Sequence, residues 1–134
     1  MNKMTAQELE HSLAGFNGTE AYHRWSILFR KHVLTDGAKF LAEHGGNSGA
    51  YWLMDLVASY HSKAMKDPSL QQIQFWTLKT DLEKHTAVAI CERDTDDVAF
   101  KQKIEYTDFQ LAEVKLYVQP SGNGEWVILL PSEY

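Results

Sequence analysis

The sequence predicts an α+β fold in which N-terminal helices are packed on one face of a C-terminal antiparallel sheet of four or five strands. Two observations carry this prediction. Apolar residues over about 5–66 recur at helical spacing, whereas over about 72–131 they alternate with a period of two. The links between the strand candidates are short, which permits only antiparallel neighbours. The 134 residues, 44% of them hydrophobic, suit a single domain over residues 1–134.

The helical part is expected to begin with two short helices. The first spans about residues 5–15, because Thr5 and Glu8 have the spacing of a capping box. Another follows the cap region at Thr35 and ends at the glycine pair 45–46. The stretch Tyr22–Val33 between them fits neither period throughout, and we interpret it as a helix.

The strongest helix is predicted over Ala50–Lys66, before Pro68 breaks it. Its apolar stripe comprises Leu53, Leu56, Val57, Tyr60 and Ala64. Its polar side comprises Asp55, Ser59, Ser62 and Lys66. We therefore expect this helix to lie on the core.

Five strand candidates follow in the second half of the chain. They are centred on residues 73–75, 86–90, 100–106, 114–118 and 126–130. Val127 and Leu129 make the last strand apolar on both sides, so it either lies centrally or is buried in a homodimer. The alternating residues Lys101, Lys103 and Glu105 indicate that water covers part of the second sheet face.

The sequence resembles a family of small proteins from bacteria, their phages and mobile elements that is known only as a domain of unknown function. The resemblance rests on residues 16–20, 35–42, 51–55 with 58–59, 106–109, 115–117 and 130–134. It implies no catalytic residue, ligand or cofactor. Two features depart from the family pattern: the Gly45–Gly49 loop is longer and richer in glycine, and Gln110 stands where proline is more usual.

Charge and composition limit the classes of partner and the cellular location that we expect for this chain. The formal net charge is −5, and residues 68–134 contain 11 Asp and Glu against 6 Lys and Arg. Phosphate contacts need clustered Lys and Arg, so we expect no nucleic-acid partner. No apolar run reaches the roughly 18–20 residues that cross a bilayer, and residues 1–5 do not begin a leader peptide. A cytoplasmic location away from membranes is expected, and the single cysteine fits a reducing compartment.

No motif in the sequence establishes an enzyme. The six histidines include no His-x-x-x-His pair, so we predict neither a metal site nor a cofactor. The catalytic alternative is a small hydrolase or transferase whose site is assembled from distant residues. The candidates are Asp36, Asp55, His61 and Cys91. Cys91 closes a strand on the same face as two alanines, where a buried, inert thiol is the ordinary case.

We therefore predict a non-catalytic accessory protein that binds another protein. Tyr51 and Trp52, near the start of the long helix, are the predicted contact residues, because both types are enriched at binding hot spots. A small-molecule-binding domain with its site between helix and sheet is a further alternative. The Gly45–Gly49 loop could present backbone N–H groups to an anion, but it lacks a phosphate-loop motif and is interpreted as a connector.

Overall fold

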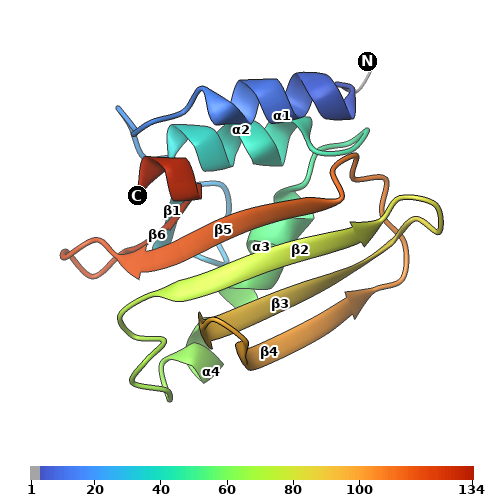
Figure 1. The fold of residues 1–134 in the computed structure, drawn as a ribbon. Helices are drawn as coiled ribbons and strands as arrows, with labels where there is room; N and C mark the ends of the chain where they lie inside the picture. The colour runs from blue at the N-terminus through green and yellow to red at the C-terminus, as the bar shows by residue number, and fades with distance from the viewer. Residues whose placement is uncertain (1–3) are drawn as a thin grey trace.

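The computed structural model describes residues 4–134 and confirms the α+β fold (Figure 1). Residues 1–3, part of the N-terminal stretch considered for a leader peptide, lie outside the described residues. The helices are α1 (Ala6–Ala14), α2 (Asp36–His44), α3 (Tyr51–Ser59), α4 (His61–Ala64) and the short 3₁₀ helix η1 (Pro131–Glu133). The strands are β1 (His32–Leu34), β2 (Gln74–Asp81), β3 (Thr86–Asp94), β4 (Asp97–Ile104), β5 (Glu113–Pro120) and β6 (Trp126–Leu129). They form one sheet in the order β1-β6-β5-β2-β3-β4.

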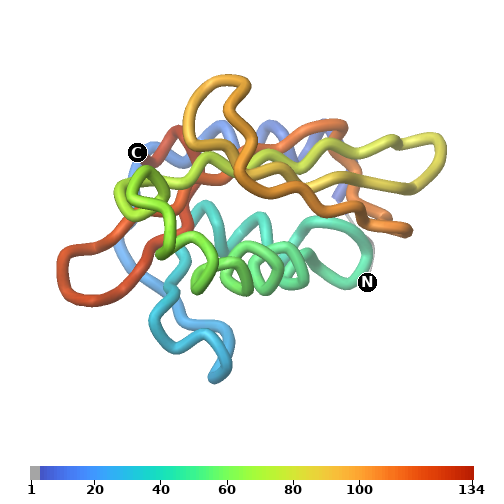
Figure 2. The backbone as a smooth tube through the Cα atoms, turned by 90° about the horizontal axis from the view of Figure 1, so that it is seen from below, coloured from blue at the N-terminus to red at the C-terminus, as the bar shows by residue number. Residues whose placement is uncertain are grey.

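The helices α2 and α3 cover one face of this sheet (Figure 2). On α3 the residues of the predicted apolar stripe, among them Leu53 and Val57, are buried in the main core. Every second residue of the strands points to the same core, including Trp76 and Leu78 on β2. Burial of one such large side chain contributes about 1.5–3 kcal/mol, so this helix–sheet contact stabilises the fold.

The N-terminal helix α1 lies beside α2 rather than on the sheet (Figure 1). It begins with the predicted capping box, in which the Thr5 hydroxyl accepts from the Glu8 amide and the Glu8 carboxylate accepts from the Thr5 amide. After α1 ends, Phe16 packs on Phe40 of α2 with ring centroids 5.5 Å apart. Leu9 is the fully buried residue of α1.

The predicted helix at Tyr22–Val33 is wrong. Most of this segment is an irregular loop, and its end forms β1, which pairs in parallel with β6. The Trp126 amide donates to the Lys31 carbonyl, and His23 and Leu34 exchange backbone hydrogen bonds of 2.8 Å. Long-range pairing thus provides hydrogen-bond partners for the backbone N–H and C=O groups of a segment whose sequence has no clear period. It also adds a sixth strand to the five predicted.

The single helix predicted over Ala50–Lys66 is interrupted at Tyr60, which separates α3 from α4. The Tyr60 amide donates to the Val57 carbonyl, three residues back, so the last turn of α3 is tightened. The Tyr60 ring packs against Trp76 and Phe100 at 5.5 and 4.9 Å. Aromatic packing on the sheet therefore accompanies the break in the helix.

The last strand, β6, lies inside the sheet rather than at its edge, which is one of the two alternatives that the sequence predicted for it. β6 lies between β1 and β5, and its outward residues Val127 and Leu129 form a second, small buried cluster with Val33. No helix within residues 4–134 is long and apolar enough to cross a membrane.

Candidate functional site

An open hollow of about 350 Å³ lies where the loop 22–31 meets the start of α3. Its lining residues are Arg24, Trp25, Ser26, Tyr51 and Asp55. Tyr51 and Asp55 are four residues apart on α3 and therefore share one helix face. The Trp25 indole N–H donates to the Asp55 carboxylate at 2.9 Å, which fixes the loop to the helix. Burial, and secondarily the charge of Glu43, raise the pKa of the Tyr51 hydroxyl, which remains a hydrogen-bond donor at neutral pH.

The loop beside this hollow carries two large apolar side chains into solvent. Ile27 is 81% exposed and Leu28 is 82% exposed. Figure 2 shows the loop, coloured blue to cyan, extending beyond α3 on the side away from the sheet. The tip is thus an exposed apolar surface continuous with a residue that lines the hollow, Trp25.

Hydrogen bonds and a ring contact link this loop to itself and to the residue before β6. The Arg24 guanidinium donates to the Arg30 carbonyl and to the carboxylate of Glu125, which precedes β6. The Arg30 side chain donates back to the Ile27 carbonyl at 3.2 Å. The Trp25 ring stacks on Phe29 at 6.2 Å. These contacts connect the exposed apolar tip, Ile27 and Leu28, to the rest of the fold.

The two predicted contact residues differ in one respect. Both are half-buried and pack against the main core, but only Tyr51 lines the hollow. Sequence reasoning missed Arg24, Trp25 and Ser26, because the segment that contains them was interpreted as a helix. The signal was present as Trp, Ile, Leu and Phe residues interspersed with arginines and fitting no single period.

Among residues 4–134, no hydrogen bond or ion pair joins any two of the four catalytic candidates. Asp55 bonds Trp25, as described above. Cys91 is fully buried on the inner face of β3, and burial raises the pKa of its thiol to about 12. The thiolate that a nucleophilic cysteine needs is therefore disfavoured at this position.

The third candidate, His61, lies in an aromatic cluster at the start of α4. Its ring contacts those of His32 and Trp126, with centroids 5.0 and 5.1 Å away. Burial, followed by the positive charge of Lys31, lowers the pKa of His61. Burial, followed by the neighbouring His61, lowers the pKa of His32 to about 4. Both imidazoles are thus neutral at physiological pH.

The fourth candidate, Asp36, opens α2 and is held by the segment before β1. Its carboxylate lies 2.8 Å from the His23 imidazole and accepts from the Glu20 amide at 3.0 Å. Its own amide donates to the Thr19 hydroxyl at 2.8 Å. The hydrogen bond to His23, followed by that to Glu20, lowers the pKa of Asp36, so the carboxylate is charged at neutral pH.

A second carboxylate, from the C-terminal segment, closes the same helix end. Glu133 accepts from the Thr35 hydroxyl at 2.6 Å, the Gly37 amide at 2.9 Å and the Leu130 amide at 3.0 Å. A Cβ atom at Gly37 would lie 2.6 Å from a Glu133 oxygen, so glycine makes this approach feasible. Three of the segments that carry the family resemblance, 16–20, 35–42 and 130–134, therefore meet at the start of α2.

The Gly45–Gly49 loop is held by side chains of the segment before β5. The Gly46 amide donates to the Gln110 side-chain oxygen at 2.8 Å, and the Asn47 amide donates to Asp108 at 2.7 Å. The Gln110 side-chain nitrogen donates to the carbonyls of His44 and Met4. The protein's own side chains thus occupy the Gly46 and Asn47 amides, two of the groups with which this loop could bind an anion.

No group of three or more His, Cys, Asp or Glu side chains within residues 4–134 is arranged to hold a metal ion. Comparison with known proteins found no match among curated proteins and none among solved structures. One family model does match, and it covers residues 7–134, nearly the whole chain. The chain therefore belongs to DUF6876, a family of unknown function.

Proposed function

We propose that this chain is a non-catalytic protein-binding domain. Its contact surface is the loop surface, formed by Arg24, Trp25, Ile27, Leu28 and Tyr51. The observation that carries the proposal is the exposure of Ile27 and Leu28, each above 80%, on a loop held by hydrogen bonds. Contact with a partner would remove both side chains from water, at about 25 cal/mol per Å² of apolar surface.

The chemistry of the neighbouring hollow supports the same function. Arg, Trp and Tyr are the residue types most enriched at protein–protein hot spots, and Arg24, Trp25 and Tyr51 all line it. The ordered loop lowers the conformational entropy that binding must overcome. The partner is expected to insert one side chain into the hollow and to cover the apolar tip with an apolar surface.

Site-directed photocrosslinking in a lysate of the cells that encode the chain tests this proposal. A photoreactive amino acid at position 28 is compared with one at position 82, because Leu82 is also an exposed leucine, at 46%, but lies in the β2–β3 turn. We expect an adduct of defined mass from position 28 only, and we expect Tyr51→Ala to abolish it. The same adducts from both positions, or an adduct that Tyr51→Ala leaves unchanged, would contradict the proposal.

A further inference from the structure

A small hollow of about 200 Å³ lies on the sheet face turned away from α2 and α3. Strands β2 and β5 form its floor, and the β3–β4 hairpin forms its wall. We call it the hairpin hollow; the residues that line it are Phe75, Trp76, Thr77, Glu92, Asp94, Thr95, Lys115 and Tyr117. It shares no residue with the loop surface, which lies on the other side of the molecule (Figure 2).

The wall exists because the β3–β4 hairpin bends over this sheet face. The pairing of β3 with β4 shifts register on both sides of Glu92, and such bulges bend a strand. Figure 2 shows the hairpin, coloured gold to orange, rising from the sheet on the side away from α2 and α3. The Arg93 guanidinium fixes the bent hairpin, because it donates to Asp67, between α4 and β2, at 2.5 Å and to Asp97 at 2.9 Å.

Side chains of both charges line the hairpin hollow. Glu92 and Asp94 belong to β3 on the wall, and Lys115 belongs to β5 on the floor. Because β2 lies between β3 and β5, two strand spacings of about 4.8 Å place their backbones roughly 10 Å apart. Within residues 4–134, no ion pair joins Lys115 to either acid. A small ligand between them can therefore contact a positive and a negative group at once.

Thr77 adds a polar group to the floor of the hairpin hollow. Its side chain is only 8% exposed and lines the hollow, whereas its neighbours Trp76 and Leu78 point into the core. In the described part of the chain, the Thr77 hydroxyl has no hydrogen-bond partner. A buried polar group without a partner lowers stability, so a ligand that bonds this hydroxyl gains affinity from it.

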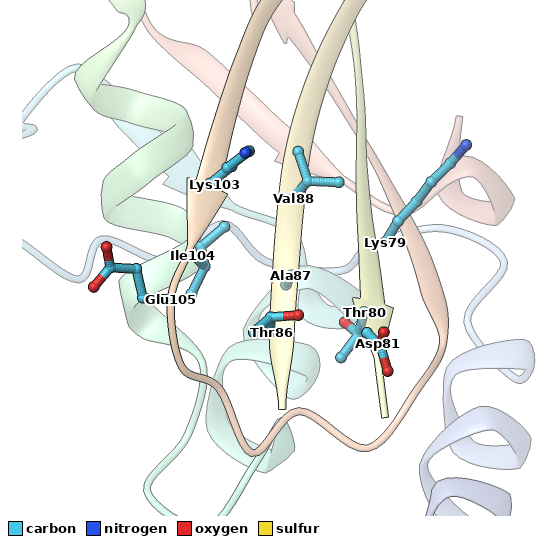
Figure 3. A pocket seen from close by; sticks show the side chains of 9 residues that line it. All are labelled: Lys79, Thr80, Asp81, Thr86, Ala87, Val88, Lys103, Ile104 and Glu105. Carbon is cyan, nitrogen blue, oxygen red and sulfur yellow. The ribbon is translucent and has the colours of Figure 1, made fainter. Parts of the chain in front are cut away.

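A larger hollow of about 760 Å³, over the opposite ends of β2, β3 and β4, is arranged differently. Figure 3 shows Val88 between its two lysines, Lys79 and Lys103, on three adjacent strands. Lys79 also lies opposite Glu113 in the pairing of β2 with β5. The charges of this larger hollow are spread along the strand ends and do not surround one small volume.

We propose that the hairpin hollow binds a free α-amino acid with an apolar side chain. The ligand carboxylate accepts from Lys115 and from the Thr77 hydroxyl, which are direct partners in the pairing of β5 with β2. The ligand ammonium donates to the carboxylates of Glu92 and Asp94. A zwitterion matches both ends of the hollow, whereas a ligand with one kind of charge leaves one end unpaired.

The aromatic residues of the floor provide the apolar part of the site. Phe75 and Tyr117 are paired on β2 and β5, and their rings pack edge to face at 5.1 Å. Tyr117 in turn packs on Tyr134 at 5.7 Å. The volume of about 200 Å³ is below the roughly 300–1,000 Å³ of sites for drug-sized ligands, so a single amino acid suits it better than a nucleotide.

NMR titration of the ¹⁵N-labelled chain with three related ligands tests this site. L-phenylalanine carries both charges, N-acetyl-L-phenylalanine lacks the ammonium, and L-phenylalanine amide lacks the carboxylate. We expect saturable shifts of the amides of β2, β5 and the β3–β4 hairpin with phenylalanine. Both derivatives should bind at least about tenfold more weakly.

Two conservative variants assign each ligand charge to its protein partner. Lys115→Gln should weaken phenylalanine binding about tenfold but leave the affinity for the amide unchanged, because the amide has no carboxylate. Glu92→Gln should weaken phenylalanine binding and leave the affinity for the N-acetyl derivative unchanged. Lys103→Gln and Glu83→Gln, at exposed positions outside the hairpin hollow, are the matched controls.

Four outcomes would overturn the inference: no saturable shifts at tens of millimolar phenylalanine, shifts that map away from the hairpin hollow, equal affinity for all three ligands, or an equal loss in the control variants. The same spectra report whether each variant is folded, so a loss of binding is separated from a loss of structure. Since the loop surface contributes no residue here, the failure of this test leaves the proposed function standing.

Discussion

At the scale of single residues, His32 is a buried titratable side chain on β1. It is 4% exposed, and burial lowers the pKa of its imidazole from 6.5 to about 4. His61, whose pKa is lowered in the same direction, packs against it edge-on. The folded state at neutral pH therefore contains an uncharged imidazole on β1. Protonation of this imidazole would destabilise the folded state.

We predict that stability falls as the pH drops from 6.5 towards 4. Over this range His32 binds a proton in the unfolded chain but not in the folded one, so the free energy of unfolding is highest above pH 6.5 and declines below it. Between pH 7 and pH 5 the loss attributable to His32 is about 2 kcal/mol. Urea unfolding at the two pH values measures it.

Two variants separate this contribution from other titrations. His32→Phe should remove most of the difference between pH 7 and pH 5, whereas His11→Phe, on the exposed side of α1, should leave it unchanged. An undiminished pH dependence in His32→Phe would contradict the assignment.

At the scale of elements, the start of α2 shows how distant segments stabilise one another. Glu133 accepts hydrogen bonds from the Thr35 hydroxyl and the Gly37 amide, so a carboxylate from the C-terminal segment caps an N-terminal helix. A negative charge at a helix N-terminus is favourable in itself. The cap therefore ties α2 to the segment that follows β6.

We predict that Glu133→Ala lowers the free energy of unfolding by about 1–3 kcal/mol, because it leaves helix amides without an acceptor. Glu10→Ala, at an exposed position of α1, is the matched control and should change stability by less than about 0.5 kcal/mol. Chemical denaturation of both variants is the measurement. Equal effects of the two substitutions would show that the cap does not stabilise the fold.

Elements with a strong internal pattern were predictable, and those that depend on distant partners were not. The alternation of residues 114–118 predicted β5, and the Thr5–Glu8 spacing predicted the capping box. The three residues of β1 have no such pattern and become a strand only by pairing with β6. The interruption at Tyr60 likewise depends on rings from β2 and β4.

The candidate site was predicted only in part, for the same reason. Helix periodicity placed Trp52 at the boundary of the apolar stripe and Tyr51 just beyond it. The loop residues that complete the hollow, such as Trp25, come from a segment whose conformation is set by long-range hydrogen bonds to Asp55 and Glu125. Local patterns in the sequence do not encode those partners.

At the scale of the whole molecule, the two proposed sites lie on opposite sides. The loop 22–31 extends beyond the helices, and the hairpin hollow is on the other side of the sheet (Figure 2). The buried core lies between the two sites. Such an arrangement suits a domain that holds a protein partner and a small ligand at the same time.

We predict that the two sites act additively. Lys115→Gln should leave the crosslink from position 28 unchanged, and Leu28→Glu should leave the affinity for phenylalanine unchanged. Crosslinking and NMR titration with the same variants measure both. A loss of phenylalanine binding in the folded Leu28→Glu variant would show that the two sites are coupled.

The parallel pairing of β1 with β6 has a consequence for how the protein is made. His32 is paired with Trp126, so the edge strand β1 cannot form its parallel pair until β6 has left the ribosome. The cap of α2 by Glu133 arrives later still. Contacts of such high sequence separation slow folding and prolong the exposure of apolar segments. The nascent helical half therefore completes its contacts only after β6 and Glu133 have been synthesised.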